Sequence, residues 1–237
     1  GAAPQRVLLD DYLFGGVEED TLWGGTGADE LYGNQQGDAL YGNQGDDRLF
    51  GGQDADALFG GQENDLLYGQ MASDVLYGQM GVDTLFGGQG DDTLFGGQEG
   101  DALWGNLGND RLEGNRGADT LDGGDGADTL VGGEGADVFR YTTPGDGGDT
   151  ILDFTAGEDR IAVFSPNFGN LEPGTLSAAH FALDNPADGD DWFVFDTATG
   201  RLSFDADGAG AGAAVEITTL NVRTLSHTDI TVLGSGT

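Results

Sequence analysis

The sequence contains no cysteine and no lysine, and only two histidines. The lack of cysteine excludes a disulfide framework and any zinc site built on cysteine. Eight arginines stand against 43 acidic residues, which gives a formal net charge of −35. Nucleic acids and anionic membrane surfaces are therefore poor partners, and multivalent cations are good ones.

Long apolar runs and catalytic signatures are also missing. No segment approaches the length of a membrane span, and residues 1–4 show neither an initiator Met nor the hydrophobic region of a signal peptide. This start is a processed end, an artificial start or a fragment boundary. There is no zinc-protease helix motif, serine nucleophile elbow or phosphate loop. His180 and His227 are interpreted as surface or structural residues, and the chain is predicted not to be an enzyme.

Glycine is abundant, with 46 of 237 residues, while hydrophobic residues make up only 37%. Such a composition is typical of disorder, but a strict period argues against it. Fourteen nine-residue units run without insertion from Gly15 to Arg140. Position 1 is always Gly, position 6 is always Asp, and position 8 is Leu except at Phe139. A fixed period with a turn half and a strand half predicts a solenoid.

Each unit divides into a turn-like part, positions 1–6, and a strand-like part, positions 7–9. If Leu at position 8 points inward, positions 7 and 9 point outward. Two units then form one 18-residue coil of a two-sided roll. Position 2 supports this coil, because its Gly, Asn and Gln residues occur in matched pairs and the Gly pairs return every 36 residues, which indicates duplication of at least two units.

The predicted fold class is all-β: a parallel β-roll solenoid of nonapeptide repeats, capped by a C-terminal antiparallel β region. An uncovered end of a solenoid is an exposed edge, so both ends are expected to carry caps. The predicted regions are a lead-in or decayed unit (1–14), the roll (15–140) and the C-terminal β cap (141–237). Strands in the cap are expected at 149–154, 160–164, 192–195, 201–204 and 215–220, with a Gly/Ala-rich loop at 206–214.

The repeated aspartate predicts metal binding. Stacked coils place one carboxylate above another on each edge, and such a column would repel itself without a cation. Calcium suits it better than magnesium, because calcium takes six to eight carboxylate and carbonyl oxygens in a flexible geometry. The candidate ligands at position 6 are Asp20, Asp29, Asp38, Asp47, Asp56, Asp65, Asp74, Asp83, Asp92, Asp101, Asp110, Asp119, Asp128 and Asp137. The candidate turn glycines at position 4 are Gly27, Gly45, Gly81, Gly90, Gly108, Gly117, Gly126 and Gly135.

The units 87–95 and 123–131 follow the pattern Gly-Gly-x-Gly-x-Asp-x-Leu-x throughout. This pattern resembles the RTX (hemolysin-type) calcium-binding repeats. The resemblance implies a parallel β-roll with Ca²⁺ between adjacent turns on each edge, which gives up to 14 − 2 = 12 inter-turn sites for fourteen units.

Segments 149–161 and 195–215 are similar to the post-roll segment and the C-terminal targeting region of type I secreted proteins. This resemblance implies an uncleaved C-terminal secretion signal and a type I secretion apparatus as partner. It also implies Gram-negative-type bacterial export to the extracellular space or the cell surface. The frame from Asp205 to Glu216 is also similar to the start of an EF-hand loop, but Ala209 stands where a ligand is needed, so a targeting-region turn is the preferred interpretation.

Position 4 departs from glycine in six units. Four of these departures lie in successive coils on one edge, and a residue other than glycine costs about 1–2 kcal/mol in the left-handed conformation. We therefore expect weak or altered calcium binding on that edge in the N-terminal half. The six residues are Glu18, Gln36, Asp54, Glu63, Ala72 and Glu99.

Position 9 is aromatic in ten consecutive units, and Phe14 extends one of the two rows. One interpretation is a cross-strand stacking ladder that stabilises the roll. The other is a contact surface for copies of the chain, a surface polysaccharide or the cell surface, since aromatic rows exceed what a monomer usually exposes. The predicted contact residues are Trp23, Tyr32, Tyr41, Phe50, Phe59, Tyr68, Tyr77, Phe86, Phe95 and Trp104.

Three functions agree with the sequence. The first is a secreted, self-assembling component of a surface, matrix or filament that folds on external calcium. The second is the non-catalytic C-terminal module of a larger exported enzyme or toxin. The third is an adhesin or carbohydrate-binding protein that uses the aromatic rows.

Overall fold

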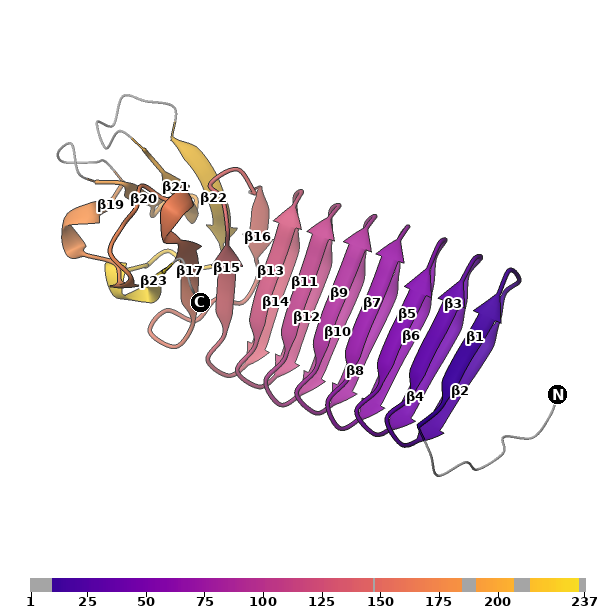
Figure 1. The fold of residues 1–237 in the computed structure, drawn as a ribbon. Coiled ribbons are helices and arrows are strands. Elements are labelled where there is room, and N and C mark those ends of the chain that lie inside the picture. Colours follow the sequence, from indigo (N-terminus) through magenta and orange to yellow (C-terminus); the bar gives the residue numbers. More distant parts are fainter. Residues whose placement is uncertain (1–9, 147, 185–190, 207–213, 235–237) are drawn as a thin grey trace.

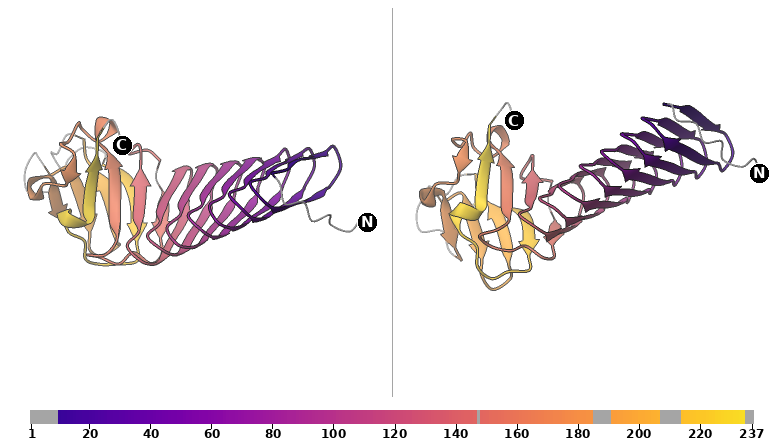
Figure 2. Two further views of the ribbon diagram at one scale, coloured as in Figure 1. Left: turned by 60° about the horizontal axis from the view of Figure 1, so that its bottom comes forward. Right: turned by 90° about the horizontal axis from the view of Figure 1, so that it is seen from below.

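The computed structural model describes residues 10–146, 148–184, 191–206 and 214–234. The chain forms a rod of stacked, flattened coils that ends in a broader C-terminal cap (Figures 1 and 2). Within these ranges no helix is long and apolar enough to cross a membrane. The strands of the rod are β1 (Tyr12–Gly16), β2 (Thr21–Thr26), β3 (Glu30–Asn34), β4 (Ala39–Gln44), β5 (Arg48–Gly52), β6 (Ala57–Gln62), β7 (Leu66–Met71), β8 (Val75–Met80), β9 (Thr84–Gln89), β10 (Thr93–Gln98), β11 (Ala102–Leu107), β12 (Arg111–Arg116), β13 (Thr120–Asp125), β14 (Thr129–Glu134) and β15 (Val138–Tyr141).

Odd-numbered and even-numbered strands of the rod form two separate parallel sheets. Each strand pairs with the strand two further along the chain, so that Leu94 lies beside Leu76 on one side and Leu112 on the other. The register of 18 residues places every unit position above its counterpart in the next coil. The predicted two-unit coil of a parallel β-roll is therefore confirmed.

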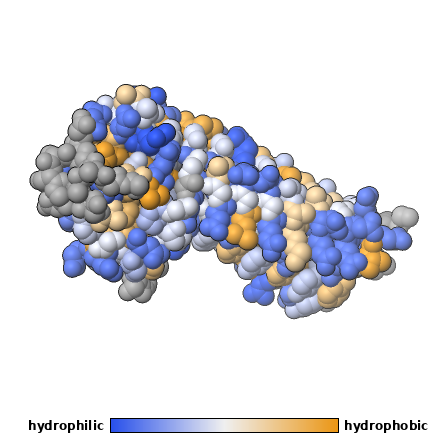
Figure 3. Space-filling view, turned by 90° about the horizontal axis from the view of Figure 1, so that it is seen from above, coloured by the Kyte–Doolittle hydropathy of each residue, from blue (hydrophilic) through white to orange (hydrophobic). Residues whose placement is uncertain are grey.

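The core of the rod is one column of inward side chains from each sheet. Every position-8 residue from Leu31 to Phe139 has 0% exposure, whereas the outward side chains at positions 7 and 9 are mostly half-buried. Leu13 and Leu22 are only partly buried, because no coil covers them at the N-terminal end. On the surface, hydrophilic and hydrophobic residues alternate along the rod (Figure 3).

The cap continues both sheets before it closes them. The predicted antiparallel hairpin is present, since Phe195 pairs with Leu202. The two cap strands that pair with the rod are parallel to it, however. Their inward apolar residues Ile151 and Ile161 lie beside Leu130 and Phe139 and continue the two core columns. The elements of the cap are β16 (Asp149–Ile151), β17 (Arg160–Phe164), η1 (Ser165–Asn167), β18 (Gly174–Thr175), η2 (Ala178–His180), β19 (Phe181–Leu183), β20 (Phe193–Asp196), β21 (Arg201–Phe204), β22 (Val215–Leu220), η3 (His227–Asp229) and β23 (Ile230–Leu233). Most of the predicted Gly/Ala-rich loop lies outside the described residues.

The strands run from position 7 to position 2 or 3 of the next unit, so the turn is shorter than the predicted positions 1–6. Two positions of each unit have positive φ, position 2 in the strand and position 4 in the turn. At position 4, glycine has φ between 115° and 147°, and the residues that replace it at 36, 54, 63, 72 and 99 have φ between 68° and 75°. Glu18 is the one replacement outside this conformation. At position 2, Asn and Gln have φ between 78° and 86°, and Gly has φ between 93° and 129°. The paired residues at position 2 thus share a left-handed conformation, which Gly and Asn adopt at least cost.

Candidate metal centre

The aspartates at position 6 form a column along each edge of the rod. From Asp29 to Asp137 these residues are nearly fully buried. In each, Oδ1 accepts a hydrogen bond of 2.7–2.9 Å from the backbone N–H of the Asp 18 residues earlier. One carboxylate oxygen therefore links adjacent coils, and this bond fixes the direction of the other oxygen.

The glycine at position 1 makes room for this carboxylate. From Gly24 onward, a Cβ added at position 1 would lie only 2.1–2.4 Å from Oδ2 of the Asp five residues later. A Cβ added at Gly105 would also lie 2.5 Å from the carbonyl oxygen of Gly123 in the next coil. Any side chain at position 1 would displace the carboxylate, so Gly and Asp are required together within one turn.

The second carboxylate oxygen has no hydrogen-bond partner. Oδ2 is buried and unpaired in each position-6 Asp from Asp29 to Asp137. Leaving a buried polar group unsatisfied costs about 1–3 kcal/mol, and more when it is charged. Thirteen such oxygens in two regular columns are the chemical environment that a divalent cation satisfies.

Burial raises the pKa of these carboxyl groups, and repulsion between neighbouring aspartates adds to it. The pKa of Asp65, Asp74 and Asp101 rises to about 8, and that of Asp92 to about 6. Without a cation the folded rod therefore favours protonated carboxyls. A bound cation removes this penalty, because an opposite charge stabilises the ionised form.

Side chains alone do not complete a cation site. Among residues 10–146, 148–184, 191–206 and 214–234, no three His, Cys, Asp or Glu side chains lie close enough to hold a metal ion. Backbone carbonyls of the turns must supply the remaining ligands, as calcium permits. The structure thus places the position-6 aspartates and the position-4 glycines in the same turns, while their role as ligands remains a prediction.

The structure adds two aspartates that sequence analysis missed. Asp149 and Asp159 continue the two columns beyond the repeats, because their Oδ1 atoms accept hydrogen bonds from the N–H groups of Asp128 at 2.9 Å and Asp137 at 3.0 Å. Spacings of 21 and 22 residues, rather than 18, hid them from a search by period. Oδ2 of Asp149 is buried and unpaired like those in the rod. Oδ2 of Asp159 accepts a 2.6 Å bond from the Thr155 N–H.

The replacements at position 4 change the turns that they occupy. Oδ2 of Asp54 accepts a hydrogen bond of 3.1 Å from the Gln36 N–H, and Oε2 of Glu63 accepts one of 2.9 Å from the Gly45 N–H. The Gln36 side-chain amide donates to the carbonyl oxygen of Val17. On the edge predicted to be weak, the Gln36 amide occupies a carbonyl oxygen that could otherwise bind a cation. Glu63 lies on the opposite edge and satisfies only an N–H group.

The other candidate residues have structural surroundings. The Nδ1 atom of His227 is 2.8 Å from the Leu176 carbonyl oxygen, and His180 packs against the Trp192 ring at 5.3 Å. In the EF-hand-like frame, residues 207–213 lie outside the described ranges.

The predicted aromatic rows are two stacked ladders. Neighbouring rings are separated by 4.7–6.0 Å and inclined by only 3–13°. One ladder runs from Phe14 to Trp104 on the odd-numbered strands, and the other from Trp23 to Phe95 on the even-numbered strands. Their ring faces are covered by each other, so most rings present only their edges to the solvent.

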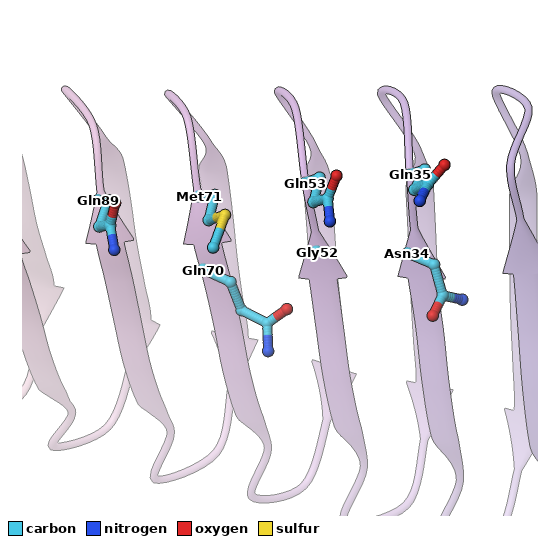
Figure 4. A pocket seen from close by; sticks show the side chains of 7 residues that line it. All are labelled: Asn34, Gln35, Gly52, Gln53, Gln70, Met71 and Gln89. Atoms are coloured by element: carbon cyan, nitrogen blue, oxygen red, sulfur yellow. The ribbon is translucent and has the colours of Figure 1, made fainter.

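A shallow groove on the turn edge contains no acid, base or nucleophile. It has a volume of ≈ 520 Å³, and Figure 4 shows the side chains of Asn34 and Gln70 on either side of Gly52. Its lining residues are Asn34, Gln35, Gly52, Gln53, Gln70, Met71 and Gln89.

The geometry defines a class of protein: a repeat solenoid with buried carboxylate columns that suit divalent cations. The family model of the RTX calcium-binding nonapeptide repeat matches four times, at residues 9–40, 32–67, 68–103 and 104–139. These matches span more than half of the 237 residues. The chain belongs to this RTX calcium-binding repeat family, which supports Ca²⁺ as the cation.

Two solved structures are similar. The AlgE6R3 subunit of the mannuronan C5-epimerase from Azotobacter vinelandii is 31% identical, with 59% of this chain and 77% of that chain covered and a TM-score of 0.41. The extracellular lipase LipA from Serratia marcescens is 15% identical, with a TM-score of 0.32. The match covers 76% of this chain and 40% of the lipase. No curated protein sequence matches the chain.

Proposed function

We propose that this chain is a secreted, non-catalytic calcium-binding β-roll that folds when it meets calcium outside the cell and then self-associates as a structural component. The observation that carries the proposal is the double column of buried, unpaired Oδ2 atoms. Proteins of this repeat family are typically exported by type I secretion. A chain that stays unfolded at low cytosolic calcium remains suitable for export.

Charge explains why folding and calcium are coupled. Twelve inter-turn calcium ions would add +24 to the net charge of −35 and leave −11. Asp149 extends one column by a further site. Without calcium, the entropy of the glycine-rich chain and the repulsion between aspartates oppose the fold, so the binding free energy acts as folding free energy.

The aromatic ladders favour contact with protein over contact with saccharide. A sugar ring stacks on the face of an aromatic ring, but in both ladders the faces of the interior rings are covered by neighbouring rings at 4.7–6.0 Å. The end rings Phe14 and Trp23 are more than half exposed. The exposed ring edges suit packing against another sheet. Self-association is therefore preferred to the adhesin or carbohydrate-binding alternative.

One observation favours the second candidate, a C-terminal module of a larger exported protein. Leu13 and Leu22 are only partly buried, and β1 and β2 lie at the open end of their sheets (Figure 1). A preceding domain would cover this end. Such a domain is compatible with the proposed calcium-dependent folding of the roll.

Circular dichroism with and without calcium tests the proposal. We expect a disordered spectrum in chelator and a β spectrum when calcium is restored, with magnesium at the same concentration as the control. A β spectrum that is the same in chelator and in calcium would refute calcium-dependent folding.

A further inference from the structure

Part of one face of the roll is free of charge in a chain of net charge −35. The strands β2, β4, β6, β8 and β10 are neighbours in one sheet and contain no Asp, Glu, Lys, Arg or His. We call their outer surface the neutral face. Charge returns on β12, with Arg111 and Glu113, and on β14, with Glu134.

The opposite sheet differs in this region. Its strands β3 and β5 carry the outward residues Glu30 and Arg48, and the hydroxyl of Tyr32 donates to Glu30. Charge therefore lies beside the aromatic ladder of that sheet near its N-terminal end. Only the neutral face combines an aromatic ladder with five consecutive uncharged strands.

The neutral face carries a row of large side chains, which we call the ridge, beside a row of smaller ones, which we call the groove. The position-9 rings, such as Tyr41 and Phe59, form the ridge, in which ring centroids are 4.7 Å apart. Position 7 beside it holds only small or β-branched residues, such as Ala39 and Ala57, which are half-buried. A two-fold axis parallel to the rod and between the two rows places the ridge of one copy over the groove of the other.

We infer that the neutral face is a self-association surface, on which a second copy of the calcium-loaded roll packs face to face about such a two-fold axis. This inference rests on the proposed calcium-dependent folding, and it identifies the surface through which the proposed self-association takes place. Like-charged copies approach with least repulsion where charge is absent, and the face is self-complementary in shape, as an interface related by a two-fold axis requires.

The size of the face sets the strength of the contact. Five strands about 4.8 Å apart and six residues of about 3.3 Å each give roughly 480 Å² per copy. About 1,000 Å² in total is at the low end for a specific interface. We therefore expect a weak, concentration-dependent dimer that added salt strengthens, because salt screens the remaining negative charge.

Sedimentation velocity of the full chain in millimolar calcium, from about 10 μM to about 1 mM protein, tests the inference. The perturbing variant is Ala57→Glu on the neutral face, and the matched control is Ala102→Glu at the same unit position on β11 of the other sheet. The unit that contains Glu30 already has glutamate at position 7, so this substitution is compatible with the repeat. Circular dichroism in calcium verifies folding, and Thr93→Glu with its control Thr84→Glu forms a second matched pair if Ala57→Glu does not fold.

The expected result is dimerisation of the wild type and of Ala102→Glu, with association weakened at least ten-fold in Ala57→Glu. A calcium-folded wild type that stays monomeric throughout would overturn the inference and leave calcium-dependent folding intact. Equal weakening in both members of a pair would also overturn it. A wild type without a calcium-induced β spectrum would instead refute the proposed function.

Discussion

A single methyl group at position 1 provides a direct test of the turn chemistry. In Gly96→Ala, the new Cβ would lie 2.4 Å from Oδ2 of Asp101 and 2.8 Å from the carbonyl oxygen of Gly114. Both distances are well inside van der Waals contact, and the backbone of the next coil is held by its own sheet. The carboxylate of Asp101 is therefore the group that moves.

This movement breaks one hydrogen bond and removes one predicted calcium ligand. Oδ1 of Asp101 accepts a 2.8 Å hydrogen bond from the Asp83 N–H, and a bond to a charged group contributes about 1.5–3 kcal/mol. With the lost ligand, we expect a destabilisation of about 3 kcal/mol, or a fall in Tm of roughly 6–12 °C for a chain of this length.

The matched control is Gly100→Ala, four residues further along the same turn. Its new Cβ would lie 2.9 Å from the Ala118 carbonyl oxygen but would contact no carboxylate. Position 5 already holds Ala118 and Ala136 in other coils, so this variant should melt closer to the wild type than Gly96→Ala does. Thermal melts followed by circular dichroism at saturating calcium, together with calcium titrations, measure both. Equal melting temperatures and equal calcium affinities for the two variants would refute the role assigned to position 1.

Three further predictions concern the columns and their edges. Asp149→Asn should lower the number of bound calcium ions by one, as counted by native mass spectrometry, whereas Asp159→Asn should leave it unchanged; the same count in both variants would contradict the distinction drawn from their Oδ2 atoms. Ala72→Gly should raise the free energy of unfolding by about 0.5–1 kcal/mol, because glycine adopts the φ of 73° observed there without strain; a lower Tm would argue against that strain. The calcium concentration at the folding midpoint should rise as pH falls from about 8 to about 5, since raised pKa values let protons compete for the same carboxylates. In chelator the pH dependence of stability is opposite, because protons then neutralise the buried carboxylates in place of calcium. Any residual β structure is favoured below about pH 4 and is lost as pH rises through the folded-state pKa values of about 6–8. A calcium midpoint independent of pH would contradict the first statement, and a circular dichroism signal in chelator that does not change with pH would contradict the second.

The sequence was sufficient to predict the rod, because two nine-residue periods equal the 18-residue offset between paired strands. Leu at position 8 and Asp at position 6 recur every nine residues, so strands offset by 18 residues place each Leu beside a Leu and each Asp beside an Asp. A shift by one or two residues would bury charged or turn residues instead. The stacking of Tyr41 on Phe59 follows from the same register.

The cap and the fine geometry of the turns could not be predicted in this way. The spacing of 21 residues between Asp128 and Asp149 obeys no period, and it depends on how the loop after β15 returns to the sheet. The separate roles of Oδ1 and Oδ2 depend on contacts between coils, which a one-dimensional pattern does not contain. Likewise, the parallel direction of β16 and β17 follows from pairing with existing sheet edges rather than from their own residues.

The alternation at position 2 has a consequence for the length of the rod. A Cβ on Gly52 would lie 2.4 Å from the carbonyl oxygen of Asn34, and one on Gly88 would lie 2.3 Å from that of Gln70. Each glycine coil therefore sits closely on a coil that carries Asn or Gln. Deleting one glycine coil of 18 residues would stack two coils that carry Asn or Gln, and a Cβ would then meet the carbonyl oxygen of the coil before it, whereas deleting 36 residues restores the original contact. Loss of a single glycine coil should therefore destabilise the rod, and loss of two coils, about 10 Å, should not.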